Sequence, residues 1–99
     1  MTKEKSRAEA TANSINQQQY TRARQKMQDG THHARLLDYL WINGQITSFE
    51  CFEKLHNTRI SATVYKLRHI YGVPVNTDYI TKNGYTFGVY SIERSNQNV

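Results

Sequence analysis

The residues best suited to bind a ligand lie between Asn57 and Tyr71, a stretch with three basic side chains and no acidic one. Within it, Ile60, Val64, Leu67 and Tyr71 recur at a spacing that turns one face of a helix toward a core. Arg and Lys on the opposite face can donate hydrogen bonds to guanine or to phosphate, and a small alanine there permits close approach to a groove. We therefore predict a recognition surface of Thr58, Arg59, Ala62, Tyr65, Lys66 and His69.

Residues 1–30 form a basic segment with six basic and three acidic side chains. A thin helical stripe runs through Ala8, Ala12, Ile15, Gln19, Ala23 and Met27. Such a stripe is too weak to hold a helix in isolation. The segment is therefore either a disordered, solvated polar arm or a helix docked on the body or on a partner subunit. In the docked form Arg22, Arg24 and Lys26 could add phosphate contacts.

A β-hairpin is predicted after the recognition stretch. Residues 75–82 alternate in polarity, Asn83-Gly84 follows, and the β-rich run 85–92 returns. Asn-Gly favours a type I′ turn, which requires positive φ at both central residues. We expect Lys82, Asn83 and Tyr85 at the tip to meet a sugar-phosphate backbone. Gly88 is interpreted as a bulge or a point of close packing.

Two further helices are predicted before the recognition stretch. The first begins at the capping residue Thr31, ends at Asn43-Gly44, and carries a core face of Leu36, Leu37, Leu40 and Trp41. Gln45-Ile46 could form a short strand. A capping box of Thr47 and Glu50 then opens the second helix, whose core face is expected to contain Phe49, Phe52 and Leu55.

The turn before the third helix and its last basic residue leave alternatives open. Asn57 or Thr58 is expected to cap that helix. Arg68 lies beside the centre of the recognition face, where it could pair with Glu50 or Glu53 or contact phosphate.

Side chains for catalysis or metal binding are not arranged for either chemistry. Cys51 is the single cysteine and has no activating partner at a suitable spacing, so we expect a small buried residue. His32 and His33 point about 100° apart on a helix, which makes them a poor metal pair, and we expect both to be exposed. With no paired carboxylates and no glycine-rich phosphate loop, we predict no enzyme activity, no cofactor and no metal.

The overall composition fits one small domain with anionic partners. The chain has 99 residues, a net charge of +5 and a pI of about 9.5. One cysteine excludes an internal disulfide, and neither a membrane span nor a signal peptide is evident, so we expect a cytoplasmic protein.

The order of these elements predicts the α+β fold of a winged helix-turn-helix, with three helices and a C-terminal two-stranded hairpin wing. We divide the chain into the arm at 1–30, the winged helix-turn-helix at 31–93 and a polar tail at 94–99. Residues 31–93 resemble the small winged helix-turn-helix domains of phages and prophages. The resemblance rests on ARLLDYLWING, QITSFECFEKL, TRISATVYKLRHIYG and the Asn-Gly hairpin.

This resemblance implies a DNA-binding protein of a phage or mobile element, acting in the bacterial host cytoplasm. By the match, the recurrent residues of the recognition helix are Arg59, Ser61, Tyr65, Leu67 and Arg68. We expect a small transcriptional regulator, or a replication or excision accessory factor, that reads double-stranded DNA and could act as a homodimer. The alternatives are a module that binds a host or viral protein through its tyrosines, and a single-stranded DNA binder.

Overall fold

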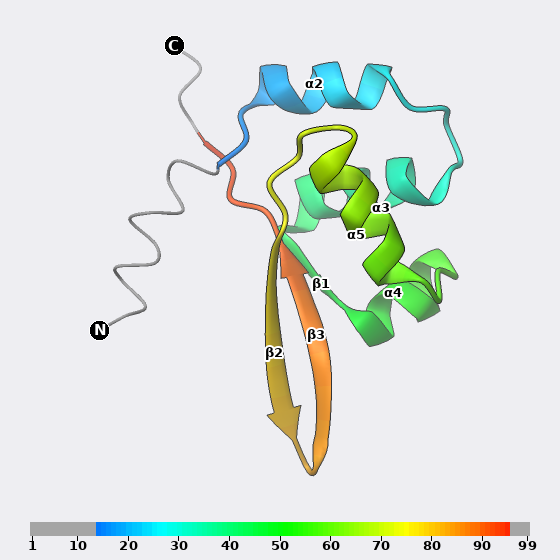
Figure 1. Cartoon of the computed structure of the whole chain (residues 1–99), viewed down its shortest axis with the longest axis vertical. Helices are drawn as coiled ribbons and strands as arrows, with labels where there is room; N and C mark the ends of the chain where they lie inside the picture. Colours follow the sequence, from blue (N-terminus) through cyan, green and yellow to red (C-terminus); the bar gives the residue numbers. More distant parts are fainter. Residues whose placement is uncertain (1–13, 96–99) are drawn as a thin grey trace.

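The computed structural model describes residues 14–95, in which a helical body precedes a protruding hairpin (Figure 1). The elements in chain order are α2 (Gln17–Gln25), α3 (His32–Asn43), β1 (Gln45–Thr47), α4 (Ser48–Leu55), α5 (Ile60–His69), β2 (Asn76–Lys82) and β3 (Tyr85–Ser91). The α+β winged helix-turn-helix prediction is confirmed: α4 and α5 are the helical pair, and β2 and β3 are the wing.

Local capping chemistry sets the ends of α3 and α4 as predicted. The Thr31 side chain accepts a hydrogen bond from the Ala34 amide, and Gly44 ends α3 with a φ of 88°. Thr47 and Glu50 form a capping box, in which each side chain accepts from the other residue's backbone amide at 3.0 Å. These bonds satisfy amides that a helix leaves without internal partners.

The start of α5 differs from the prediction. Arg59 occupies the N-cap position and makes no side-chain cap, so neither Asn57 nor Thr58 caps the helix. Asn57 is instead buried beneath the turn: its amide donates to the Thr63 hydroxyl at 2.9 Å, and its oxygen accepts from the Arg59 backbone amide at 2.8 Å. The turn is thus held by a buried side chain, and Thr58 is exposed.

The three strands form an antiparallel sheet in the order β1-β3-β2. Asn83 and Gly84 have φ values of 52° and 81°, as the predicted hairpin turn requires. The short strand foreseen at Gln45-Ile46 pairs with β3, so that Ile46 lies opposite Tyr90. The sheet therefore has one strand more than the two-stranded wing that the sequence predicted.

Gly88 is a point of close packing and not a bulge. It pairs in regular register with Tyr79. A β-carbon placed on Gly88 would lie 2.9 Å from the hydroxyl of the buried Tyr90. Only glycine leaves room for this tyrosine to reach the core.

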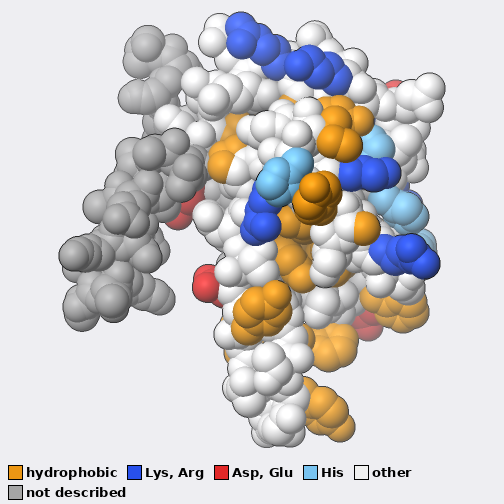
Figure 2. Space-filling model, viewed as in Figure 1, with side chains coloured by type: hydrophobic (Ala, Val, Ile, Leu, Met, Phe, Trp, Pro, Cys, Tyr) orange, Lys and Arg blue, Asp and Glu red, His pale blue; other side chains and the backbone are white. Residues whose placement is uncertain are grey.

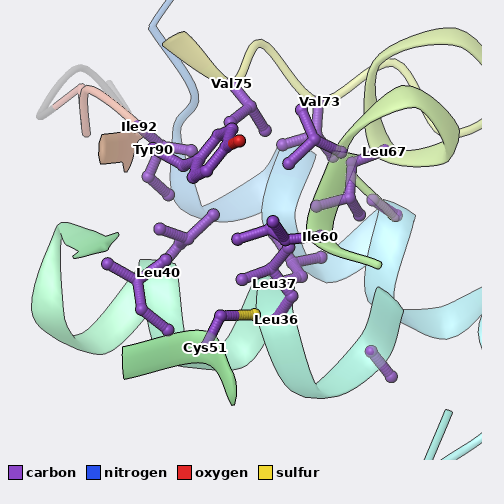
Figure 3. Close-up of a cluster of buried hydrophobic side chains, with 14 of the residues drawn as sticks. Leu36, Leu37, Leu40, Cys51, Ile60, Leu67, Val73, Val75, Tyr90 and Ile92 are labelled. Atoms are coloured by element: carbon purple, nitrogen blue, oxygen red, sulfur yellow. The ribbon is translucent and has the colours of Figure 1, made fainter. Parts of the chain in front are cut away.

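The core lies between α3, α5 and the base of the sheet (Figure 3). Leu36, Leu37 and Leu40 of α3 are fully buried, and Ile60, Val64 and Leu67 of α5 are at most 8% exposed. These are the residues that the helical spacing placed in the core. Tyr71, expected beside them, is half-buried.

The predicted core face of α4 is wrong in two of its three residues. Phe49 and Phe52 are 59% and 56% exposed, whereas Cys51 and Leu55 are buried. Because α4 has only two turns, only one row of its side chains can pack against the core. The i, i+4 pair of Cys51 and Leu55 occupies that row and leaves both phenylalanines on the flank.

The segment before residue 31 contains the docked helix of the two alternatives, within the described part of the chain. Ile15, Ala23 and Met27 are buried in the common core; Ala8 and Ala12 of the proposed stripe lie outside the described residues. The Tyr20 ring stacks on Trp41 with centroids 4.5 Å apart. Helix α2 thereby covers one face of the Trp41 ring, and Trp41 is half-buried.

Residues 93–95 also pack against Trp41 and Ile15. The Arg94 guanidinium lies 4.2 Å from the Trp41 ring centroid and donates to the Trp41 carbonyl. Ile15 donates a backbone hydrogen bond to Glu93 and accepts one from Ser95, each at 2.9 Å. Arg94, at the start of the predicted tail, is therefore part of the packed body; residues 96–99 lie outside the described ones.

The burial of Cys51 predicts that its thiol reacts slowly, because the sulfur points into the core beside Leu36 (Figure 3). Loss of solvation raises the pKa of this thiol to about 11. At pH 8 its thiolate fraction is then about two hundredfold below that of a free cysteine. We expect Ellman's reagent to label the native chain slowly and the unfolded chain within seconds. Rapid labelling of the native chain would contradict this packing.

Candidate nucleic-acid interface

The outward face of α5 and the turn just before it carry the predicted recognition residues, with Thr58 in the turn and Arg59 at the N-cap of α5. All of them are exposed, together with Ser61, while Ile60, Val64 and Leu67 face the core. Figure 2 shows Lys, Arg and His side chains around this face, with hydrophobic side chains both among them and along the hairpin. The exposure of the recognition residues is confirmed; their contacts with DNA remain a prediction.

An aromatic pair lies on the same face. The rings of Tyr65 and His69, one helical turn apart, have centroids 4.3 Å from each other. Tyr65 is 61% exposed, so its hydroxyl remains accessible to a ligand. Ala62 precedes Tyr65 by three residues and is small enough to let DNA approach the helix.

A groove of about 660 Å³ lies beside this face, between the start of α3, the turn at 56–58 and α5. Its lining residues include the three histidines His32, His33 and His56 and the cations Arg59 and Lys66, but no carboxylate. Such a lining suits an anionic group. Sequence reasoning missed the groove because its histidines come from segments far apart in the chain.

His33 is half-buried and not exposed as predicted. Its ring stacks on Tyr71 at 5.2 Å, and its Nε2 lies 3.3 Å from the Tyr71 hydroxyl. Burial, followed by the charges of Lys66 and His32, lowers the pKa of His33. Because the unfolded chain then binds the proton more tightly than the folded one, the lowered pKa of His33 makes the folded state less stable as the pH drops below about 6.5.

Arg68 joins α5 to the wing. Its Nε donates to the Val75 carbonyl at 2.8 Å, and its Nη2 donates to the Thr77 hydroxyl at 2.7 Å. Of the two alternatives that the sequence left open for Arg68, the pairing with Glu50 or Glu53 is not formed, because the guanidinium binds Val75 and Thr77 instead. Arg68 is placed to fix the position of the hairpin relative to α5, and a phosphate contact by Arg68 stays a prediction.

The hairpin tip places its predicted contacts in solvent. Lys82, Asn83 and Tyr85 are all exposed, and Tyr85 is 71% exposed. The Thr81 and Thr86 hydroxyls lie 2.8 Å apart across the two strands just below the tip. The tip is thus held in a defined geometry, and its DNA contacts remain a prediction.

The three arm cations have different surroundings. Arg22 and Lys26 are exposed on α2, at the end of the body opposite the hairpin tip (Figure 1). Arg24 is instead bound to Asp29 at 2.7 Å and to Asp38 at 3.0 Å, and hydrogen bonds to both carboxylates raise its pKa. Its charge is therefore compensated within the protein.

Asp38 also accepts a hydrogen bond from the Tyr20 hydroxyl at 2.7 Å. Burial and this carboxylate raise the pKa of Tyr20 to about 12. Asp38 thus fastens two residues of α2, Tyr20 and Arg24, to α3. Sequence reasoning did not identify Asp38 as a binding residue, because its partners Tyr20 and Arg24 lie 18 and 14 residues before it in the chain.

These surroundings predict opposite effects for two neighbouring arginines. Arg24→Ala should lower the free energy of unfolding by about 1 kcal/mol, because it removes the hydrogen bonds to Asp38. Arg22→Ala should leave stability unchanged but reduce the salt dependence of DNA binding by about one unit. Urea unfolding and DNA titrations at several salt concentrations measure the two effects. The reverse assignment of effects would contradict the structure.

Two absences hold for residues 14–95. Among them no His, Cys, Asp and Glu side chains form a group of three that could hold a metal ion. No helix in the same range is long and apolar enough to cross a membrane.

A helical pair whose second helix exposes a basic face beside a β-hairpin defines a protein of the winged-helix class, whose members typically bind DNA and have no catalytic activity. Residues 31–94 match the family model described as "Winged helix-turn-helix domain". The chain belongs to this family. Comparisons with curated proteins and with solved structures gave no match. Helix α2 lies before the matched region.

Proposed function

We propose that this protein binds duplex DNA through α5, as a small transcriptional regulator or a replication or excision accessory factor of a phage or mobile element, in the cytoplasm of its host. The supporting observation is the exposed face of α5, which carries Arg59, Lys66 and hydrogen-bonding side chains but no carboxylate. The phage setting is supported by the sequence resemblance of residues 31–93.

In this proposal α5 enters the major groove with Arg59 and Lys66 directed at base edges or at flanking phosphates. The groove between the start of α3 and α5 lies beside this face and offers its histidine side chains, with Arg59 and Lys66, to a phosphate. The hairpin tip meets the backbone on one side of α5. Arg22 and Lys26 of α2 lie on the other side and extend the basic surface.

A fluorescence-anisotropy titration of the full chain with labelled duplex and single-stranded DNA tests the proposal. Four exposed cations, Arg22, Lys26, Arg59 and Lys66, predict that the logarithm of the affinity falls with the logarithm of salt concentration with a slope of about −4. We expect duplex DNA to bind more tightly than a single strand of equal length. Tighter binding to the single strand would favour base stacking on the exposed Tyr79 and Tyr85. Absence of binding at low salt would contradict the proposal.

A further inference from the structure

The outer edge of the hairpin is free to pair with another strand. In the sheet order β1-β3-β2, the only strand hydrogen-bonded to β2 within residues 14–95 is β3, so the other edge of this seven-residue strand has no strand beside it (Figure 1). Unpaired amides and carbonyls along such an edge form a template for a further strand.

The charges on β2 are symmetric about Ile80. Asp78 precedes it by two residues and Lys82 follows it by two, so all three side chains share one face of the sheet. The two charged residues are about 13 Å apart along an extended strand, too far to pair with each other. Neither takes part in any ion pair among residues 14–95.

We propose that β2 pairs antiparallel with β2 of a second copy of this chain, with Ile80 opposite Ile80. In that register Asp78 of each copy lies directly opposite Lys82 of the other, which gives two favourable cross-strand charge pairs. A parallel pairing in register would place Asp78 against Asp78 and Lys82 against Lys82. The charges that would discourage other strands from adding to this edge therefore favour this one arrangement.

An apolar row supports the same register. Phe87 lies opposite Ile80 in the hairpin, and the Phe87 ring contacts the Phe49 ring at 5.2 Å. Ile80 is 44% exposed and Phe49 is 59% exposed. Pairing of Ile80 with its copy brings the two rows side by side as one continuous apolar strip across both subunits.

The pairing leaves both recognition helices accessible. Thr77 and Tyr90 occupy the sheet face opposite to Ile80, and Arg68 of α5 binds Thr77 on that face. The two-fold axis of an antiparallel edge pairing is perpendicular to the sheet, so both α5 helices lie on the same side of it. Two half-sites on one DNA face could then be bound together, a consequence that rests on the proposed function. In the dimer Lys82 pairs with Asp78 of the second copy in place of a phosphate, so the backbone contacts proposed for the hairpin tip are left to Asn83 and Tyr85.

Sedimentation velocity of the full chain without DNA tests the dimer independently of DNA binding. We expect a concentration-dependent dimer, which Asp78→Lys should weaken by about tenfold to a hundredfold because two attractive pairs become repulsive. The double variant Asp78→Lys with Lys82→Asp exchanges the charges and should restore dimerisation. Glu53→Lys is the matched control, with the same charge change at an exposed acid of α4, and should leave the dimer intact.

Three outcomes would overturn the proposal. The first is a wild-type chain that stays monomeric at about 200 μM, a concentration far above the dissociation constants of stable dimers. The second is a charge-exchanged double variant that is as monomeric as Asp78→Lys. The third is a dimer that Glu53→Lys weakens as much as Asp78→Lys does. A DNA titration adds a test in which the dimer and the monomer predict opposite changes in duplex affinity. Asp78→Ala should weaken duplex binding through loss of the dimer, whereas removal of an acid from a monomer near phosphates would strengthen it.

Discussion

The combined substitution of Arg59→Ala and Lys66→Ala is expected to reduce duplex affinity by about a hundredfold or more while the thermal midpoint stays nearly constant. Both side chains are exposed on the carboxylate-free face of α5, and neither is in a hydrogen bond or an ion pair within residues 14–95. Each contact from such a cation contributes about 1–3 kcal/mol to binding. Alanine favours a helix at position 66, and the Arg59 side chain makes no cap hydrogen bond that its removal would break, so we expect little change in the stability of the fold.

Anisotropy titrations and thermal melts of the same preparations measure the two quantities. Lys54→Ala, which removes an exposed positive charge from α4, serves as the control and should change the affinity much less. A double variant that binds duplex DNA as well as the wild type would show that α5 is not the recognition helix.

Asn57→Ala is expected to cause the largest loss of stability among single polar substitutions in the helical pair. Asn57 is 3% exposed and bridges the Thr63 hydroxyl and the Arg59 amide. Its removal leaves buried polar groups without partners, at a cost of about 2 kcal/mol. For a domain of this size the thermal midpoint should fall by about 8–16 °C.

Thr58→Ala tests the same turn without the buried bonds. Since the Thr58 side chain is exposed and does not cap α5, its loss should change the free energy of unfolding by less than about 0.5 kcal/mol. Chemical denaturation compares the two variants. Equal effects would mean that Thr58 caps the helix in solution, as its sequence position suggested.

Features determined by a few neighbouring residues could be predicted from the sequence. The caps at Thr31 and Thr47 and the hairpin turn at Asn83 depend on residues at most three positions away. The core stripes of α3 and α5 follow from helical periodicity alone. These signals agreed with one another, and their order was sufficient to predict the winged helix.

Features that depend on distant contacts could not be predicted. The two-turn helix α4 offers several apolar residues for one buried stripe, and only the placement of the sheet decides that Cys51 is buried and Phe49 is not. Arg68 could reach several acceptors, and the path of the chain after α5 brings Val75 and Thr77 within its reach. The pairing of β1 with β3 likewise joins segments more than forty residues apart.

The candidate site was predicted in composition but not in full extent. Periodicity identified the exposed side of α5, including Tyr65 and Lys66, because a core stripe defines its opposite. The histidine-lined groove was missed because His32 and His56 come to line the same groove only through the packing of α3 beside the turn. Arg24 was predicted to contact phosphate, but its guanidinium forms ion pairs with Asp29 and Asp38. Helical periodicity does not reveal such pairs.

The central claim, that α5 is the DNA-binding surface, is tested most directly by an NMR titration of the isotope-labelled chain with a short duplex. We expect the amide signals of Ala62, Tyr65 and Lys66 to shift most, followed by those of the hairpin tip, while Ile42 at the far end of α3 stays unchanged. Shifts confined to the surface around Phe49 and Phe52, with α5 unaffected, would contradict the account.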